Sequence, residues 1–159
     1  MDNVSVSVVI PAFNEESTVG LVVHCIYQVL EELGLSFEVI VVDDGSDDNT
    51  ALVCENYGAR VIKNGRRMGK GTALRMGFHA CSGNVVVPLD ADGSHRPEEI
   101  PRLMAPILND GFEVTLGSRL FDLGSPLKVR FRHLGNLIFS FLISLFCRKR
   151  VFDSQCGFR

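Results

Sequence analysis

The sequence predicts an α/β fold, with a mostly parallel sheet and helices on both of its faces. Short β-branched apolar runs alternate with longer segments whose apolar residues recur at helical spacing. Most intervals between successive runs are also long enough for a crossover helix, which neighbouring parallel strands require. Alternation of this kind is typical of sheets that are covered by helices on two sides.

The first three elements follow from simple patterns. Val4–Ile10 is short, β-branched and stopped by Pro11, which predicts a buried strand. Apolar residues at helical spacing run over residues 19–33, and Gly34 ends this helix. Phe37–Val42 is the second apolar run and predicts a second strand.

The same alternation continues to residue 116. Asp48 or Asn49 is placed to cap a helix that reaches Tyr57. Pro97 suits the first turn of a later helix, where the two glutamates that follow it favour the helix dipole. Further strands are predicted at Ala59–Lys63, Val85–Leu89 and Phe112–Leu116, and further helices at Thr72–Cys81 and Pro97–Leu108.

Length and composition indicate one compact globular domain. The chain has 159 residues, of which 46% are hydrophobic and 22% are charged, and its net charge is −3. The length suits a single domain over residues 1–159, and the charge gives no basic field for nucleic acid. The five cysteines are odd in number and lack metal-site spacing, which favours a reducing compartment over a disulfide scaffold. No signal-peptide pattern opens the chain, so we expect a cytoplasmic protein.

Polar clusters follow three of the predicted strands. Asn14 and Glu15 come after the first strand, Asp43 and Asp44 after the second, and an Asp-Ala-Asp triplet after the strand at 85–89. Ligands of parallel sheets bind at the carboxyl ends of strands. The sequence therefore places a candidate site at this edge.

Asp90 and Asp92 form that triplet, and residues two apart in extended backbone point to the same side. Two unpaired carboxylates facing one point would repel each other, and Mg²⁺ or Mn²⁺ would relieve this repulsion. A solvated turn is the alternative, because Asp and Gly are common turn residues. Asp44 could accept hydrogen bonds from a base or a ribose, and His95 is expected to have a positional role.

A basic loop, Gly65–Thr72, precedes one predicted helix. It is not a Walker A loop, because three residues separate its first two glycines and Gly71 follows Lys70. It also lacks the dinucleotide fingerprint, since Leu74 stands where a third glycine belongs. Lys70 and free N–H groups at the helix start could hold a diphosphate, and a surface loop is the alternative.

Six segments occur in an order that is highly specific as a set. They are Ser7–Glu16, Val41–Asp48, Gly69–Gly71, Asp90–Glu98, Gly117–Arg119 and Asp153–Arg159. Together they resemble family 2 glycosyltransferases of the GT-A fold, a Rossmann-like fold of nucleotide-diphospho-sugar transferases. Because of the closing DSQCGFR, the chain looks most like the dolichyl-phosphate (polyprenyl-phosphate) mannose and glucose synthases. Relatives usually continue past this motif, so the resemblance implies a chain that is truncated at its carboxyl end or unusually short.

The resemblance implies a donor site. Lys70 would lie near the diphosphate of GDP-mannose or UDP-glucose. Asp90 and Asp92 would bind Mg²⁺ or Mn²⁺, with Ser94 near the position of a third, weaker ligand. The residues that would hold the nucleoside are Pro11, Phe13, Glu15 and Asp44.

The resemblance also implies an acceptor side. Arg119 and Arg132 would meet the phosphate of a polyprenyl or dolichyl phosphate, and Asp153 and Arg159 belong to the acceptor-side motif. With Asp92, the residues Arg119 and Asp153 form the expected catalytic set. An acceptor phosphate is already anionic, so the expected reaction is one inverting displacement of the nucleoside diphosphate, without a covalent enzyme intermediate.

A membrane surface is a further expected partner. Leu134–Cys147 is the most apolar stretch, and basic residues flank it within residues 127–150. It is shorter than the ~20 residues that span a bilayer. An interfacial helix and a core helix both fit the pattern, and a lipid acceptor favours the interface at the cytoplasmic face of a membrane.

Three other functions fit parts of the pattern. A family 2 glycosyltransferase with another acceptor would keep the same donor site. A sugar nucleotidyltransferase usually opens with a glycine-rich basic loop after its first strand, where this chain has Pro11-Ala12-Phe13-Asn14-Glu15. A non-catalytic nucleotide-binding module is the third alternative.

Overall fold

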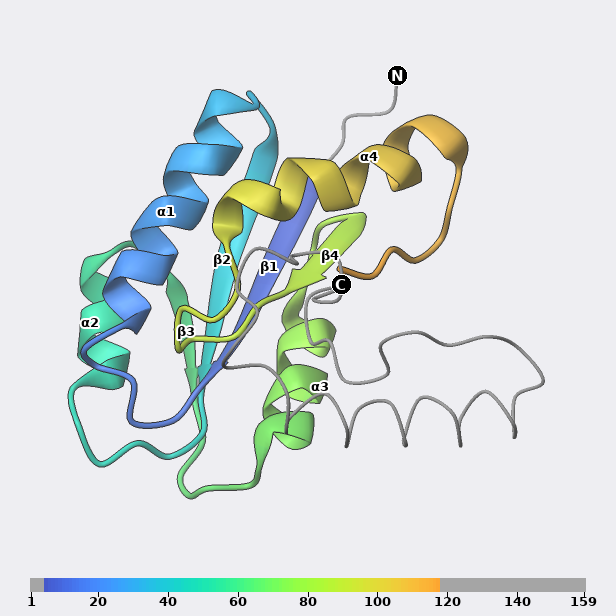
Figure 1. The fold of residues 1–159 in the computed structure, drawn as a ribbon. Helices are drawn as coiled ribbons and strands as arrows, with labels where there is room; N and C mark the ends of the chain where they lie inside the picture. The colour runs from blue at the N-terminus through green and yellow to red at the C-terminus, as the bar shows by residue number, and fades with distance from the viewer. Residues whose placement is uncertain (1–4, 118–159) are drawn as a thin grey trace, which may run out of the picture. The chain divides into compact units, whose positions relative to one another are not determined.

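A computed structural model describes residues 5–117 of the chain, and all but the last two belong to one compact unit, Met1–Thr115. The described residues form a four-stranded parallel sheet in the order β3-β2-β1-β4. Figure 1 shows how the helices lie around it. The elements are β1 Ser5–Ala12, α1 Val19–Glu32, β2 Ser36–Asp43, α2 Thr50–Asn56, β3 Arg60–Lys63, α3 Lys70–Ala80, β4 Val85–Pro88, the 3₁₀ turn η1 Pro97–Glu99 and α4 Ile100–Asp110.

The predicted α/β architecture is confirmed, with helices on both faces of the parallel sheet. Ile40 and Val42 of β2 pack with Ala73 of α3 in one buried cluster. Alternation along the strand turns Val39 and Val41, which are also buried, to the opposite face. Helices α1 and α2 contact each other and β2, and α2 also contacts β3.

Helix α3 lies very close to the centre of the sheet, and a glycine makes this possible. A Cβ atom at Gly77 would lie 2.3 Å from Cγ1 of Val9 and 3.3 Å from Cγ2 of Val42. The basic loop before α3 is thereby held at the carboxyl ends of β1 and β2.

The predicted strand at Phe112–Leu116 is wrong for the structure described. These residues are irregular and pair with none of the four strands. Phe112 is 58% exposed and Val114 is 67% exposed, so the alternating apolar residues do not bury a face. Instead the hydroxyl of Thr115 donates a hydrogen bond to the carbonyl of Leu103 on α4, at 2.7 Å. The helix predicted at 97–108 begins as a 3₁₀ turn and ends at Asp110, followed by the C-cap residue Gly111 with a φ of +72°.

Several of the sequence predictions lie outside the described residues. They are Arg119, Arg132, Asp153, Arg159 and the apolar segment within residues 127–150. Across residues 5–117, none of the helices combines the length and the apolar character needed to cross a membrane.

Candidate active site

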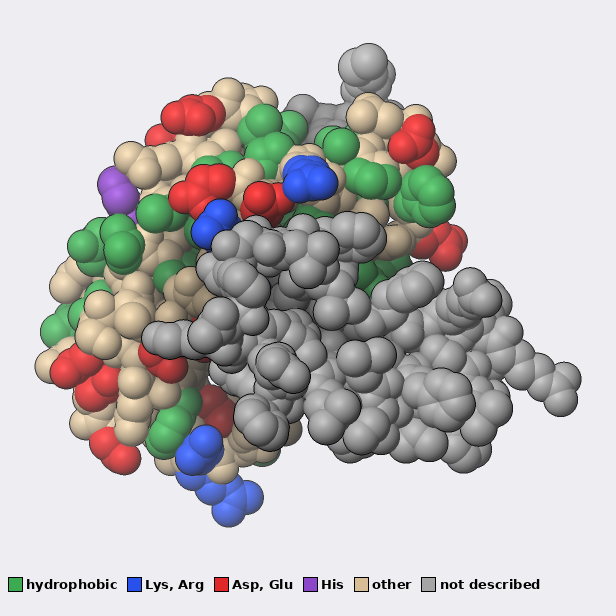
Figure 2. Space-filling view, viewed as in Figure 1, with side chains coloured by type: hydrophobic (Ala, Val, Ile, Leu, Met, Phe, Trp, Pro, Cys, Tyr) green, Lys and Arg blue, Asp and Glu red, His purple; other side chains and the backbone are tan. Residues whose placement is uncertain are grey.

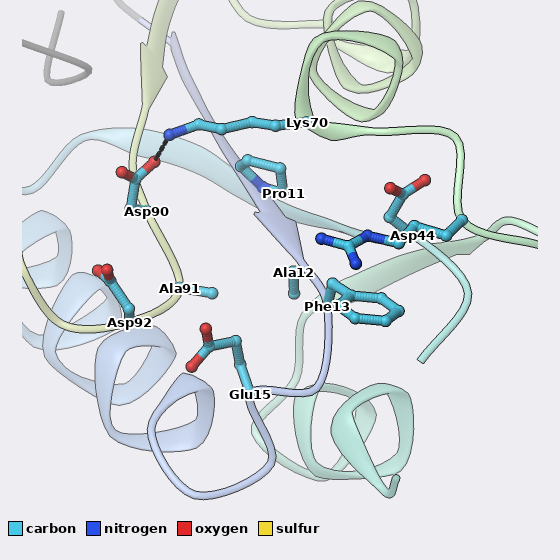
Figure 3. Close-up of a pocket in the computed structure, with 10 residues that line it drawn as sticks. Pro11, Ala12, Phe13, Glu15, Asp44, Lys70, Asp90, Ala91 and Asp92 are labelled. Carbon is cyan, nitrogen blue, oxygen red and sulfur yellow. Dashed lines mark hydrogen bonds and ion pairs between the residues drawn. The ribbon is translucent and has the colours of Figure 1, made fainter. Parts of the chain in front are cut away.

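The carboxyl ends of three strands meet at one edge of the sheet. Ala12 of β1 pairs with Asp43 of β2, and the amide of Asp44 donates to the carbonyl of Ala12 at 2.8 Å. On the other side, the amide of Leu89 donates to the carbonyl of Val9 at 3.0 Å. A pocket of about 260 Å³ opens at this edge (Figure 3). Its lining residues are Pro11, Ala12, Phe13, Glu15, Asp44, Arg67, Lys70, Asp90, Ala91 and Asp92.

Hydrogen bonds join the loop after β1 to the loop after β2. Asn14 has a φ of +55°, and its amide donates to the hydroxyl of Ser46 at 2.9 Å. Its side-chain oxygen accepts a hydrogen bond from the amide of Asp47 at 2.9 Å. The amide of Glu15 donates to the hydroxyl of Thr50 at 2.8 Å. These bonds fix the backbone that carries Phe13 and Glu15 into the pocket.

Asp48 adds further hydrogen bonds between these two loops, at the start of α2. Its Oδ1 accepts the amide of Thr50 at 2.9 Å, and its Oδ2 accepts the amide of Glu16 at 3.2 Å. The carboxylate of Glu16 in turn accepts the amide of Asn49 at 2.9 Å. Asn49 is the N-cap residue of α2 and makes no side-chain capping bond, whereas Asp48, one residue earlier, accepts the amide of the first helical residue. Asp48, Glu16 and Asn49 therefore hydrogen-bond with one another in this part of the chain.

Asp44 anchors the basic loop. Its side chain is 3% exposed and accepts three hydrogen bonds, from Asn64 Nδ2 at 2.8 Å and from the amides of Met68 at 2.9 Å and Gly69 at 2.7 Å. Burial alone would raise the pKa of Asp44, but these hydrogen bonds outweigh it and lower that pKa. Asp44 lines the pocket as predicted, and it also has a structural role that the sequence did not reveal.

Gly45 lets the two loops approach each other. A Cβ atom at this position would lie 2.6 Å from the carbonyl carbon of Arg66 and 2.7 Å from the amide nitrogen of Arg67. Its φ of +79° also favours glycine. The basic loop therefore sits directly against the end of β2.

Arg67 is a pocket residue that sequence reasoning did not single out. The central carbon of its guanidinium lies 4.1 Å from the centre of the Phe13 ring, which is cation–π geometry. The pair of arginines in the basic loop was the available signal. Only the fold shows which of the two turns toward β1. Arg67 and Phe13 together form one wall of the pocket.

Lys70 and Asp90 form an ion pair across the pocket. The ammonium of Lys70 lies 2.5 Å from Oδ1 of Asp90, and the two side chains are 54% and 21% exposed. Figure 3 shows Lys70 reaching from the start of α3 to the carboxylate. The sequence predicts that Asp90 and Asp92 are two unpaired carboxylates. The structure instead gives Asp90 a cationic partner.

Asp92 is held by the turn that follows it. Its Oδ1 accepts the amide of Ser94 at 2.9 Å. Burial would raise the pKa of Asp92, but the hydrogen bonds from Ser94 and the nearby His95 and Lys70 lower it. His95 is buried, and its Nδ1 accepts the amide of Asp90 at 3.2 Å. His95 therefore has the positional role that the sequence indicated.

The pocket suits a divalent cation that is shared with a ligand. Within residues 5–117, no three His, Cys, Asp or Glu side chains are gathered closely enough to hold a metal ion alone. Asp90 and Asp92 offer carboxylate oxygens, and the Lys70 ammonium already stands where a cation is attracted. Mg²⁺ commonly binds one or two carboxylates and completes its shell with water and phosphate oxygens. Two aspartates beside a basic loop fit that mode.

Seven residues predicted for the donor side are brought together in this pocket. They are Pro11, Phe13, Glu15, Asp44, Lys70, Asp90 and Asp92. Its four carboxylates and two cationic side chains leave two negative charges in excess, a balance that favours a divalent cation.

Comparison with known proteins agrees with this geometry. The model of the family described as "Glycosyl transferase family 2" matches residues 7–159. The human dolichyl-phosphate beta-glucosyltransferase is 35% identical over an alignment of 173 residues, gaps included. This alignment covers 96% of this chain and 53% of that enzyme. The undecaprenyl-phosphate 4-deoxy-4-formamido-L-arabinose transferase of Proteus mirabilis is 39% identical over 121 residues, 72% of this chain and 36% of that enzyme. The chain spans about half the length of several curated relatives that it matches.

Solved structures share the fold of the described unit. Glucosyl-3-phosphoglycerate synthase from Mycobacterium tuberculosis was crystallised with Mn²⁺, uridine diphosphate and glucosyl-3-phosphoglycerate. It matches with a TM-score of 0.57 and 36% identity, over 66% of this chain and 40% of that chain.

Proposed function

The chain belongs to glycosyl transferase family 2, and from that premise we propose that the protein transfers mannose or glucose from a nucleotide-diphospho-sugar to a polyprenyl or dolichyl phosphate. The donor is GDP-mannose or UDP-glucose, and Mg²⁺ or Mn²⁺ assists the transfer. One observation carries the proposal: carboxylates and basic side chains converge in a single pocket at the carboxyl ends of three parallel strands.

The donor would lie along this pocket. Phe13 and Arg67 offer flat surfaces on which a nucleobase can stack, and Glu15, which lines the same pocket, offers carboxylate oxygens for a ribose. Lys70 stands at the start of α3, where its ammonium can meet a diphosphate. Asp90 and Asp92 would hold the divalent cation against the same phosphates. The pairing of a divalent cation with a nucleoside diphosphate is supported by a related synthase, which was crystallised with Mn²⁺ and uridine diphosphate.

The chemistry asked of the chain is mainly electrostatic. A lipid phosphate is anionic near neutral pH, so its oxygen needs little deprotonation before it attacks the sugar carbon. Arg119 and Arg132 would orient this phosphate, because a guanidinium binds phosphate oxygens in a bidentate manner. Lys70 would offer positive charge to the departing diphosphate. A bound cation would supply further neutralisation of that leaving group. We expect inversion at the sugar carbon, since one displacement suffices.

The acceptor assignment rests on the named relatives and on the segment at 127–150. The human relative is named for dolichyl phosphate and the Proteus mirabilis relative for undecaprenyl phosphate. Basic residues flank the apolar stretch of the segment, which suits the headgroup zone of a membrane. We therefore propose that the protein works as a peripheral protein at the cytoplasmic face of a membrane, where Asp153 and Arg159 complete the acceptor side.

A small phosphorylated acceptor is the competing proposal. The solved structures of similar fold include enzymes named as phosphoglycerate synthases. The same donor site would serve either acceptor, so the acceptor itself must be tested. The family match leaves the nucleotidyltransferase alternative without support.

The deciding assay is transfer of radiolabelled sugar by the complete natural protein, with polyprenyl phosphate in one arm and 3-phosphoglycerate in the other. Arg119→Ala should slow transfer to the lipid by about one to two orders of magnitude, because a charge-assisted bond is worth ~1.5–3 kcal/mol. Donor affinity should stay nearly unchanged. Arg102→Ala is the matched control, since Arg102 is 86% exposed and pairs with Glu99, and neither residue lines the pocket.

Three results would count against the proposal. Equal loss of donor binding in Arg119→Ala would place that residue on the diphosphate instead. Transfer to 3-phosphoglycerate alone would replace the lipid acceptor. Nucleotide binding without transfer to any acceptor would favour a non-catalytic module.

A further inference from the structure

We propose that Lys70 and the divalent cation compete for Asp90, so that the cation binds strongly only after a nucleoside diphosphate has drawn Lys70 away. This inference rests on the proposed function, because it takes the pocket as the donor site. It adds an order to the binding events. Lys70 acts as a positioning residue that occupies the cation's place until the diphosphate arrives.

Both ends of the ion pair have anchored backbones. The residue before Lys70 is Gly69, whose amide is held by Asp44 at 2.7 Å. The amide of Asp90 is held by His95 at 3.2 Å. Since both backbones are anchored, the ion pair can be broken by movement of the Lys70 side chain alone. That side chain is 54% exposed, and a lysine has four rotatable carbons between its backbone and its ammonium.

The ion pair makes Asp90 less available to a divalent cation. With its ammonium 2.5 Å from Asp90 Oδ1, Lys70 neutralises one of the two aspartates. A divalent ion that approaches Asp90 meets a positive charge at contact distance, and the repulsion lowers its affinity. Asp92 remains, but one of its oxygens already accepts the amide of Ser94. In Figure 3 a dashed line joins Lys70 to Asp90.

A diphosphate reverses this balance. It offers Lys70 several anionic oxygens in place of one carboxylate, and it offers the metal ion phosphate oxygens of its own. Once Lys70 turns to the diphosphate, Asp90 is free to bind the cation. Coupling between two ligands is reciprocal, so the cation should also tighten nucleotide binding by the same factor.

The experiment measures Mn²⁺ binding by calorimetry, first without nucleotide and then with UDP or GDP present. Lys70→Met keeps the length of the side chain and removes its charge. Without nucleotide, this variant should bind Mn²⁺ about three- to tenfold more tightly than the natural protein, as expected for removing a partly exposed cation. The coupling between Mn²⁺ and nucleotide should shrink by the same factor.

The matched control is Lys63→Met. Lys63 also forms an ion pair, with Glu55 at 2.8 Å, but neither residue lines the pocket. Its Mn²⁺ affinity should equal that of the natural protein. Lys70→Gln is a second variant, so that the comparison does not depend on one substitution.

The possible failures can be told apart. Equal Mn²⁺ affinity in the natural protein and both Lys70 variants, with coupling retained, would overturn the competition and leave the proposed donor site intact. No Mn²⁺ binding by any of them, even with nucleotide, would overturn the metal assignment and the competition with it. Weaker Mn²⁺ binding in the Lys70 variants without nucleotide would also refute the competition, because it would make Lys70 a support of the cation site.

Discussion

Replacing Asp44 by Asn tests whether this carboxylate builds the pocket. The natural side chain accepts three hydrogen bonds from the loop over residues 64–69 while being only 3% exposed. An amide has one acceptor oxygen, and its NH₂ group would face an N–H donor. At least one loop donor then loses its partner inside the protein.

The expected cost can be worked from these bonds. A hydrogen bond to a charged group is worth ~1.5–3 kcal/mol, and leaving a buried donor unsatisfied costs ~1–3 kcal/mol. The bonds share one side chain and are not additive, so we expect Asp44→Asn to lower the free energy of unfolding by about 2–4 kcal/mol. Urea denaturation measures this directly. Proteolysis should also become faster at the loop, because Met68 and Gly69 lose their anchor.

The pH dependence gives an independent check on Asp44. Its pKa is lowered in the folded protein, so its contribution to stability is present above the ordinary aspartate pKa of about 3.9 and is lost as pH falls through the lower folded value. Asp44→Asn should flatten this part of the acid-stability curve. Asp47→Asn is the control, because Asp47 is exposed and engages Asn14 only through its amide. An Asp44→Asn protein as stable as the Asp47→Asn protein, with an unchanged loop, would refute the reasoning.

Three other changes test the remaining parts of the site. Arg67→Ala should weaken nucleotide binding by about two- to fivefold in a titration, as expected for losing one exposed cation–π contact with a nucleobase that stacks beside Phe13. The thermal midpoint should stay nearly constant, and an unchanged affinity would remove Arg67 from the donor site. Asp92→Asn should abolish the effect of Mn²⁺ on nucleotide affinity in calorimetry while the fold is kept, and a retained Mn²⁺ effect would contradict the metal assignment. The natural protein should co-sediment with anionic vesicles in a salt-dependent manner, and changing Phe139 and Phe141 to Ser should release it. If those two changes instead abolish the thermal transition, the segment at 127–150 is core rather than interfacial.

The sequence was sufficient to place the acidic residues, because their position depends on local patterns. Asp90 and Asp92 follow a short apolar run, and Asp44 follows another. Parallel strands bring such positions to one edge, whatever the details of packing. The alternation of strand and helix patterns likewise predicted that helices cover both faces of the sheet.

The partners of these residues could not be predicted in the same way. The three donors to Asp44 lie 20, 24 and 25 residues away and reach it only when the basic loop folds against β2. Lys70 and Asp90 are 20 residues apart and approach each other across the sheet edge. The prediction of a strand at Phe112–Leu116 was wrong for a related reason. Strand propensity is a local property, whereas strand pairing needs the edge of a neighbouring strand at the right place.

The hydrogen bonds between the loops after β1 and β2 lower the entropic cost of binding a ligand there. Bonds such as those from Asn14 to Ser46 and from Glu16 to Asp48 order this side of the pocket before any ligand arrives. A ligand that docks there loses little affinity to the conformational entropy of the protein. Arg67 and Lys70 are exposed, and their tips are held by the contact with Phe13 and by the ion pair with Asp90. A ligand that draws these two cationic side chains from their present partners would pay its entropic cost mainly there. Substitutions that remove the bonds between the two loops would add the cost of ordering the backbone of those loops.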